Sequence, residues 1–302
     1  MPYFHHNKNI FFDKIQRATL DEIELFEPDL FNISLFILRL DKIDDQISGN
    51  KIFKLKYYLL DAITNNQPIL TYGGAYSNHL AATSKACFEL SIKCTGIVRG
   101  ERPTKLSHTL EYCLQQNMQL IFISREEYDL DPKPIPEPYT AHLIIPEGGF
   151  GEQGVQGASE IKSLYGNNFT HVCMPLGTTT TFAGVISAAT SEEVIGIDIV
   201  KDSTDTTNRL NSLINTTKNA YKIYNNYNFG GYAKSTPQLF SFMNNLYKKY
   251  NIPIDFVYTG KMMFGIFDLM EKGYFNPGSK ILCIHTGGLQ GNLSLPSNKL
   301  NF

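Results

Sequence analysis

The chain alternates between two kinds of hydrophobic pattern. Short runs rich in apolar and β-branched residues have the length of β-strands, and some, such as residues 142–146, are apolar at nearly every position, as is typical of strands covered on both faces. Amphipathic stretches of helical period lie between many of them. The predicted strands are residues 33–40, 68–72, 94–99, 119–124, 142–146, 171–176, 194–200, 254–258 and 280–286. The predicted helices are residues 77–90, 105–116, 236–250 and 260–273. This alternation predicts an α/β fold with parallel sheets flanked by helices.

Two segments depart from this pattern. Residues 128–139 contain four prolines, which predicts an extended loop. Residues 202–229 are mostly polar, and we expect a surface helix and a loop there.

Composition narrows the possible functions. At 302 residues the chain can form one large or two modest domains. The net charge of −2 leaves no basic excess to neutralise a nucleic-acid backbone, so we expect no nucleic-acid partner. No apolar window reaches membrane-spanning length, and the first residues lack the apolar stretch of a signal peptide. The five cysteines form no CxxC pair, which favours neither a disulfide framework nor a metal site. We expect a cytoplasmic protein without a membrane partner.

Glycine-rich turns follow several of the predicted strands, at residues 72–79, 146–154, 175–184 and 285–291. In parallel α/β sheets, ligands bind at the carboxyl ends of strands, where such turns lie. The turn at 177–180, Gly-Thr-Thr-Thr at a helix start, offers backbone and hydroxyl donors to a phosphate monoester. It lacks the Gly-Lys-Ser/Thr ending of a nucleotide P-loop, and a threonine that caps the helix would explain the same residues.

Lys51 is the candidate for covalent chemistry. The turn Ser48-Gly49-Asn50 precedes it, and the apolar period that follows predicts that a helix begins there. The positive end of the helix dipole favours a neutral amine, which is the form that attacks a carbonyl group. From its position alone, an exposed surface lysine is the competing interpretation.

An ordered set of motifs decides between these interpretations. They are SGNKxxKLxY at 48–57, GGxxSNH at 73–79, EGG at 147–149, the Gly-Thr turn at 177–180, YTGKMM at 258–263 and HTGG at 285–288. In residue type, order and spacing, the chain resembles the 1-aminocyclopropane-1-carboxylate deaminase / D-cysteine desulfhydrase family from about Ile33 to Gly291. That family belongs to the fold type II, tryptophan-synthase-β-like enzymes, which use pyridoxal 5′-phosphate.

The resemblance implies how the cofactor is held. Lys51 matches the lysine that binds pyridoxal phosphate as a Schiff base and then moves the α-proton, and Asn78 matches the residue that hydrogen-bonds the 3′-oxygen. Thr286 would face the pyridine nitrogen. The residues that match the phosphate cup are Gly177, Thr178, Thr179 and Thr180.

The resemblance also implies which residues meet a small amino-acid substrate. Ser77 matches the serine near the substrate carboxylate, and His79 beside it is given a supporting role. Tyr258 matches an active-site tyrosine, and Tyr232 corresponds, in a looser alignment, to a second one.

Two positions bear on the reaction. Within the family, ring-opening deaminases tend to carry YEGK, with the glutamate facing the pyridine nitrogen, whereas this chain has Thr259 at that place and Thr286 in HTGG. A neutral hydroxyl leaves a weaker electron sink, which suits β-elimination of a good leaving group. The resemblance therefore implies a lyase that converts D-cysteine and water to pyruvate, hydrogen sulfide and ammonia. The alternatives are ring opening of 1-aminocyclopropane-1-carboxylate to 2-oxobutyrate and ammonia, a threonine-synthase-like or serine-dehydratase-like reaction, and a non-catalytic relative that binds the cofactor.

The resemblance also implies the architecture. We expect a large cofactor-binding domain from residues 1–53 and 161–302, a small α/β domain inserted at 54–160, and the cofactor between them. Relatives of this kind are usually homodimers, so we expect a homodimer here.

Overall fold

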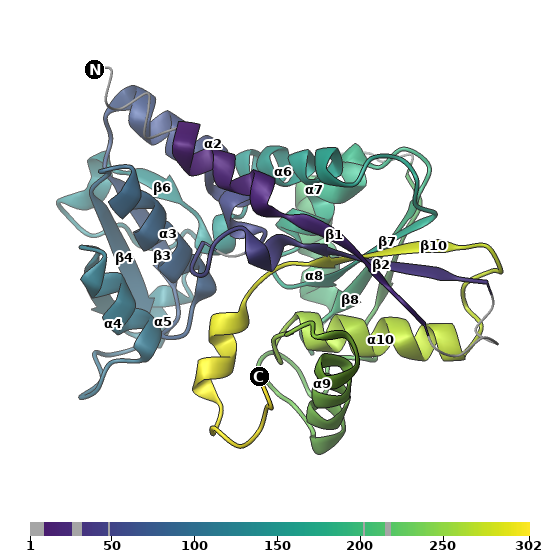
Figure 1. Ribbon diagram of the computed structural model, residues 1–302. Helices are drawn as coiled ribbons and strands as arrows, with labels where there is room; N and C mark the ends of the chain where they lie inside the picture. The colour runs from purple at the N-terminus through teal and green to yellow at the C-terminus, as the bar shows by residue number, and fades with distance from the viewer. Residues whose placement is uncertain (1–8, 26–31, 48, 202, 215–218) are drawn as a thin grey trace.

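The strands assemble into two separate sheets, which lie on opposite sides of the molecule in Figure 1. The computed structural model describes residues 9–25, 32–47, 49–201, 203–214 and 219–302. Ser48 of the predicted turn and parts of the polar segment 202–229 lie outside the described residues. An α/β fold with parallel sheets flanked by helices is confirmed.

The larger sheet has six strands in the order β1-β2-β10-β7-β8-β9. All neighbours are parallel except β1 and β2, which pair antiparallel, so this sheet is mixed at one edge. The strands are β1 (Thr19–Ile23), β2 (Ser34–Arg39), β7 (His171–Leu176), β8 (Glu193–Asp198), β9 (Tyr221–Tyr224) and β10 (Lys280–His285).

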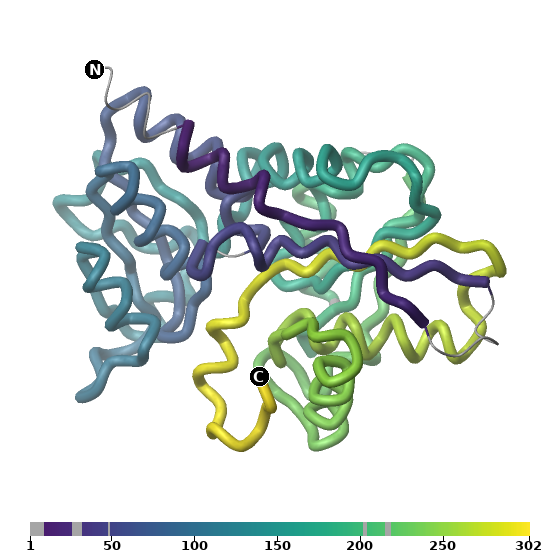
Figure 2. Tube along the Cα trace, viewed as in Figure 1, coloured from purple at the N-terminus to yellow at the C-terminus, as the bar shows by residue number. Residues whose placement is uncertain are grey.

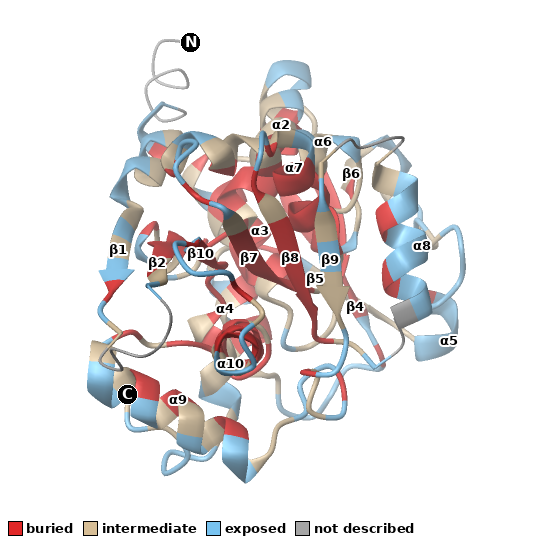
Figure 3. Cartoon of the chain, turned by 90° about the vertical axis from the view of Figure 1, so that its right-hand side faces the viewer, coloured by how far each residue is buried: buried red, intermediate tan, exposed pale blue. Residues whose placement is uncertain are grey.

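Helices cover both faces of the six-stranded sheet, which explains why its central strands are apolar throughout. Val172 and Met174 of β7 lie in a core shared with helix α7, whereas Cys173 between them packs with α9 and α10 on the other face. Figure 3 shows β7 and β8 buried between these layers. The helices that accompany the larger sheet, on its two faces together, are α6 (Glu152–Ser159), α7 (Thr180–Ala188), α8 (Ser203–Leu213), α9 (Pro237–Tyr250) and α10 (Thr259–Glu271).

The smaller sheet has four parallel strands in the order β5-β4-β3-β6. They are β3 (Ile69–Gly73), β4 (Cys94–Arg99), β5 (Gln119–Ile123) and β6 (Leu143–Ile145). The accompanying helices are α2 (Lys51–Asn65), α3 (Asn78–Glu89), α4 (His108–Gln115) and α5 (Arg125–Tyr128). Short 3-10 turns are η1 (Lys14–Arg17), η2 (Leu40–Lys42), η3 (Tyr139–Ala141), η4 (Glu147–Gly149), η5 (Glu160–Leu164) and η6 (Leu289–Ser294).

The chain passes between the two sheets twice, as Figure 2 shows. It leaves the larger sheet after β2, enters the smaller one through α2, and returns after β6. All four strands of the smaller sheet lie within residues 54–160, but α6 lies there too and packs against α7 of the larger sheet. The domain boundaries at 53/54 and 160/161 stay a prediction.

One predicted strand is wrong and two strands were missed. Residues 254–258 do not extend, because the Asp255 carboxylate accepts hydrogen bonds from the backbone N–H groups of Val257, Tyr258 and Thr259 and so turns the chain into α10. The edge strands β1 and β9 were not predicted; each pairs with a neighbour on one side only. Within the described residues, no helix is both long and apolar enough to cross a membrane.

Candidate active site

A cavity of about 450 Å³ lies where the carboxyl ends of strands from both sheets meet. Its wall is formed by the turns that follow β3, β6, β7 and β10, as expected for a ligand site in parallel sheets. Nearly all the predicted site residues line it: Lys51, Ser77, Asn78, Gly177, Thr178, Thr179, Tyr232, Tyr258 and Thr286. Thr180 is the exception, because it begins α7 and is fully buried behind the turn.

Lys51 is the first residue of α2 and is held in place by its neighbour. Its Nζ donates to Asn50 Oδ1 at 3.0 Å, and Asn50 Nδ2 donates to Thr181 Oγ1 at 2.7 Å. Burial lowers the pKa of the Lys51 ammonium to about 8, although the negative charge of Asp255 opposes the shift. A substantial fraction of this amine is therefore neutral near physiological pH, which is the form that a Schiff base requires.

Lys54, one turn further along α2, is a site residue to which the sequence analysis gave no role. Its side chain is buried, and its Nζ donates to Thr178 Oγ1 at 2.8 Å. Burial, and then the positive charge of Lys51, lower the pKa of Lys54 well below its usual range. The sequence contains one indication of this: Lys51 and Lys54 are three residues apart in the SGNKxxKLxY motif, which puts both lysines on one face of a helix.

The turn from Gly177 to Thr179 forms a small cup in front of helix α7. A Cβ atom at Gly177 would lie 3.0 Å from the Tyr258 ring, so a side chain there would crowd that ring. Thr179 has a left-handed conformation with φ of 61°, which brings the chain sharply round before α7 begins. Backbone N–H groups at a helix start and the nearby Lys54 make this cup suitable for a phosphate group.

Thr286 follows β10 and packs tightly against the turn before Lys51. Its carbonyl oxygen accepts from the Asn50 N–H at 3.2 Å. Gly49 has a φ of 69°, and a Cβ there would lie only 1.7 Å from that same oxygen. Glycine at 49 is therefore required for this contact, which fixes Lys51 relative to Thr286.

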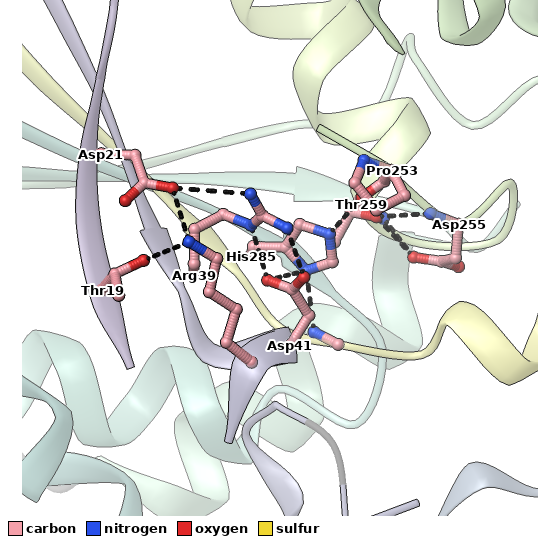
Figure 4. Close-up of polar contacts among 10 residues, drawn as sticks. Thr19, Asp21, Arg39, Asp41, Pro253, Asp255, Thr259 and His285 are labelled. Atoms are coloured by element: carbon pink, nitrogen blue, oxygen red, sulfur yellow. Dashed lines mark hydrogen bonds and ion pairs between the residues drawn. The ribbon is translucent and has the colours of Figure 1, made fainter. Parts of the chain in front are cut away.

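A polar network around His285, Asp41 and Arg39 lies next to the turn that carries Thr286 (Figure 4). His285 Nε2 lies 2.8 Å from the Pro253 carbonyl oxygen, and its Nδ1 accepts from the Gly287 N–H at 3.1 Å, so the proton is on Nε2. Asp41 lies 3.6 Å from that Nδ1. Arg39 binds both carboxylate oxygens of Asp41, at 2.8 and 2.7 Å. These contacts orient the turn on both sides of Thr286.

The wall contributed by the smaller sheet carries Ser77, Asn78 and His79 at the start of α3. Ser77 caps the helix by accepting from the Leu80 N–H at 3.3 Å. Among the described residues, Asn78 Oδ1 is buried without a hydrogen-bond partner, and so is His79 Nδ1. Burial lowers the pKa of His79 well below its usual range, so the ring is neutral. These unpaired atoms are available to a ligand.

Tyr258 and Tyr232 stand side by side at the cavity, with ring centroids 6.0 Å apart in an edge-to-face arrangement. Burial raises the pKa of the Tyr258 phenol well above its usual range, so it remains a proton donor. Tyr232 comes from the loop before α9 and is 54% exposed. Although Tyr232 aligns only loosely with the family's second tyrosine, it lies at the same cavity as Tyr258.

Thr259 does not line the cavity. It is fully buried, and its Oγ1 donates to Asp255 Oδ1 at 2.6 Å. Asp255 is thus a buried carboxylate close to the place where the deaminases' YEGK motif has its glutamate, and the sequence analysis missed it. Its oxygens are already engaged by Thr259 and by three backbone N–H groups. Of the described residues that line the cavity, Glu147 alone carries a carboxylate, and it follows β6 of the smaller sheet.

Comparison with known sequences agrees with this geometry. Residues 29–287 match the family model described as pyridoxal-phosphate dependent enzyme. A putative 1-aminocyclopropane-1-carboxylate deaminase of Pyrococcus abyssi is 29% identical, with 86% of each chain covered. A bifunctional D-cysteine desulfhydrase/1-aminocyclopropane-1-carboxylate deaminase, mitochondrial, of Arabidopsis thaliana is 28% identical, with 85% of this chain and 73% of the relative covered.

Comparison with solved structures agrees on the fold. The crystal structure of a homologue of 1-aminocyclopropane-1-carboxylate deaminase superposes with a TM-score of 0.74 at 23% identity, covering 91% of this chain and 90% of the other. The resemblance inferred from the ordered motifs is confirmed, and so is the fold type that it implied.

Proposed function

Since this chain belongs to the family of pyridoxal-phosphate dependent enzymes, we propose that it catalyses the α,β-elimination of D-cysteine, giving pyruvate, hydrogen sulfide and ammonia with the uptake of one water. The observation that carries the proposal is the neutral hydroxyl residue Thr286 at the carboxyl end of β10, the position expected to face the pyridine nitrogen.

The residues of the cavity fit pyridoxal phosphate. Burial lowers the pKa values of the Lys51 and Lys54 amines, and a phosphate dianion in the cup beside Lys54 would stabilise the charged form of that lysine. Lys54 already contacts Thr178 of the cup. At the other end, the unpaired Asn78 Oδ1 is available to a polar substituent of the ring. The donor set therefore suits an aromatic aldehyde that carries a phosphate.

The bound cofactor supplies the electron sink that stabilises negative charge at the substrate's Cα. Lys51 is the base that we expect to take the α-proton, because its amine is held by Asn50, whose backbone N–H in turn binds the Thr286 carbonyl oxygen. Ser77 and the first N–H groups of α3 form an anion site suited to the substrate carboxylate. The protonated phenols of Tyr258 and Tyr232 can orient the substrate or donate a proton to its leaving group.

Elimination is favoured over ring opening because Thr286, the residue expected to face the pyridine nitrogen, is neutral and not a carboxylate. A carboxylate paired with the pyridine nitrogen would keep the ring protonated and strengthen the sink, which opening an unactivated cyclopropane needs. The buried carboxylate nearby, Asp255, is engaged by four donors of its own segment. Sulfide leaves readily, so a weaker sink suffices for D-cysteine.

The second candidate is the cyclopropane deaminase itself. The names of the relatives favour it: the Pyrococcus protein is described as a putative deaminase, and the Arabidopsis relative carries both activities in its name. Both candidates use the same cavity and cofactor.

The test is a visible spectrum of the purified protein, followed by D-cysteine, L-cysteine, β-chloro-D-alanine and 1-aminocyclopropane-1-carboxylate in separate reactions. Pyruvate and sulfide from D-cysteine, without 2-oxobutyrate from the cyclopropane, is the expected result. 2-Oxobutyrate formation at a comparable rate would replace the desulfhydrase with the deaminase. A preference for L-cysteine would overturn the proposed stereochemistry.

A further inference from the structure

Lys261, the lysine of the YTGKMM motif, has no part in the roles described so far, yet its side chain is fully buried. Its Nζ donates to two backbone carbonyl oxygens, those of Asn228 at 2.8 Å and Gly231 at 2.7 Å. Both acceptors belong to the loop that carries Tyr232. Burying an ammonium group is costly unless its donors are satisfied, so this pair of contacts is a specific link between α10 and that loop.

The rest of the loop follows the same face of α10. Phe229 packs edge-to-face on Phe264 with centroids 5.0 Å apart. The Tyr227 hydroxyl donates to Asp268 Oδ2 at 2.6 Å, and a Cβ at Gly265 would lie 2.9 Å from the Tyr227 ring. Because residues three and four apart lie on one side of a helix, the loop is attached to α10 at successive turns.

The first of these attachments is at the cavity. Tyr258, just before α10, packs on Tyr232, and Lys261 binds the carbonyl group immediately before Tyr232 in the chain. Tyr232 itself is 54% exposed, and its ring packs edge-to-face on Tyr258. Its position therefore depends on how its own backbone is held.

The loop backbone is unfavourable without such support. Phe229 and Ala233 have φ values of 52° and 53°, a left-handed conformation that is unfavourable for L-residues. Gly230 and Gly231 between them have φ values of 95° and 116°. A segment in this conformation keeps it only where the surroundings impose it.

We propose that Lys261 is a positioning residue: by binding the carbonyl oxygens of Asn228 and Gly231 it holds the 227–233 loop against α10 and so places Tyr232 at the substrate end of the cavity. The role of Tyr232 toward substrate rests on the function proposed above, whereas the attachment of the loop does not.

The attachment is tested by limited trypsin digestion of Lys261→Met, with cleavage after the exposed Lys234 followed by mass spectrometry. Lys248→Met, the same change at an exposed position in the last turn of α9, is the matched control. We expect cleavage after Lys234 to become at least about tenfold faster in Lys261→Met and to stay unchanged in the control. An unchanged rate in Lys261→Met would overturn the proposal. This measurement needs no substrate, so it stands whichever amino acid the enzyme uses.

The consequence for Tyr232 is tested by a double-mutant cycle. Lys261→Met is expected to lower kcat/KM by about tenfold in the wild-type background and by less than about twofold in Tyr232→Ala, because the side chain that Lys261 places is then absent. An equal loss in both backgrounds would show that Lys261 does not act through Tyr232.

Lys261→Gln covers the case in which Lys261→Met does not fold. Its side chain is shorter and can reach at most one of the two carbonyl groups, so we expect cleavage after Lys234 faster than in the wild type. Wild-type resistance to trypsin would count against the proposal.

Discussion

The two walls of the cavity differ in how their polar groups are held. On the first wall, made by the start of α2 and the turn after β10, Lys51, Lys54 and the Thr286 carbonyl each have a hydrogen-bond partner within the protein, and the turn of Thr286 rests on the His285–Asp41–Arg39 network. On the side of the smaller sheet, Ser77 has one long hydrogen bond, and Asn78 Oδ1 has no partner among the described residues.

This difference separates two tasks. Groups that are already bonded are fixed before any ligand arrives, which suits the attachment of a cofactor in one orientation. Buried polar atoms without a partner have lost their hydration without compensation. They regain a hydrogen bond only when a ligand binds, so they contribute to the free energy of ligand binding. We therefore expect changes on the first wall to affect the attachment of the cofactor. Changes on the second wall, apart from Asn78 beside the cofactor ring, should affect the substrate.

The largest effect is expected for Lys51→Ala. Elimination activity should fall by more than about a thousandfold, and the visible absorbance of the attached cofactor should be lost, because no other amine occupies this position. Lys56→Ala, a change of the same type on the outer part of α2, is the control and should keep both. An active Lys51→Ala enzyme would refute the assignment of the whole first wall.

The next effect concerns pH. The Lys51 amine attacks only when neutral, and burial lowers its pKa to about 8, so the rate at which apoprotein takes up pyridoxal phosphate should rise about tenfold per pH unit below 8 and level off above it. Stopped-flow absorbance measures this rate. A rate that keeps rising toward pH 10.5 would indicate an ordinary, unburied lysine.

A smaller effect is expected for Lys54→Met. Loss of a charged hydrogen-bond donor beside the cup should weaken binding of pyridoxal phosphate by about 10- to 100-fold, and should leave pyridoxal, which lacks the phosphate, nearly unaffected. Equilibrium titration of the apoprotein gives both constants, with Lys56→Met as control. Equal weakening for the two ligands would mean that Lys54 does not serve the phosphate.

The smallest effect is expected on the second wall. Ser77→Ala should raise KM by about 5- to 10-fold with little change in the affinity for the cofactor, as for the loss of one neutral hydrogen bond. Ser124→Ala removes another helix cap beside the smaller sheet and controls for the loss of stability. If Ser77→Ala instead released the cofactor, the division between the walls would be wrong.

The sequence predicts best what depends on neighbouring residues. The central strands, the helix that begins at Lys51 and the glycine-rich turn at 177–180 follow from local pattern, and the ordered motifs pointed to one family. The apolar segment 254–258 shows the limit of that reasoning. It has the composition of a strand, but the carboxylate of Asp255 binds the N–H groups that a strand would offer to its neighbour.

Other features depend on contacts between distant segments. Lys54 looks like one of many surface lysines until α2 packs against the turn at Gly149, where a Cβ would lie 3.3 Å from the Lys54 side chain. Lys261 was within a quoted motif, but its acceptors are backbone carbonyl groups of a loop whose sequence has no special signature. Such burial is decided by tertiary packing, which one sequence does not reveal.

The place of β10 in the larger sheet has a consequence for how the protein matures during synthesis. This strand is made after the other five strands of the larger sheet, yet it lies between β2 and β7 and leads into the Thr286 carbonyl group against which Gly49 and Asn50 pack. Until it emerges from the ribosome, the N-terminal hairpin and the β7–β9 strands have no common partner. A nascent or truncated chain that ends before Lys280 therefore cannot complete the wall of the cavity, and we expect it to take up cofactor only after β10 has been added to the sheet.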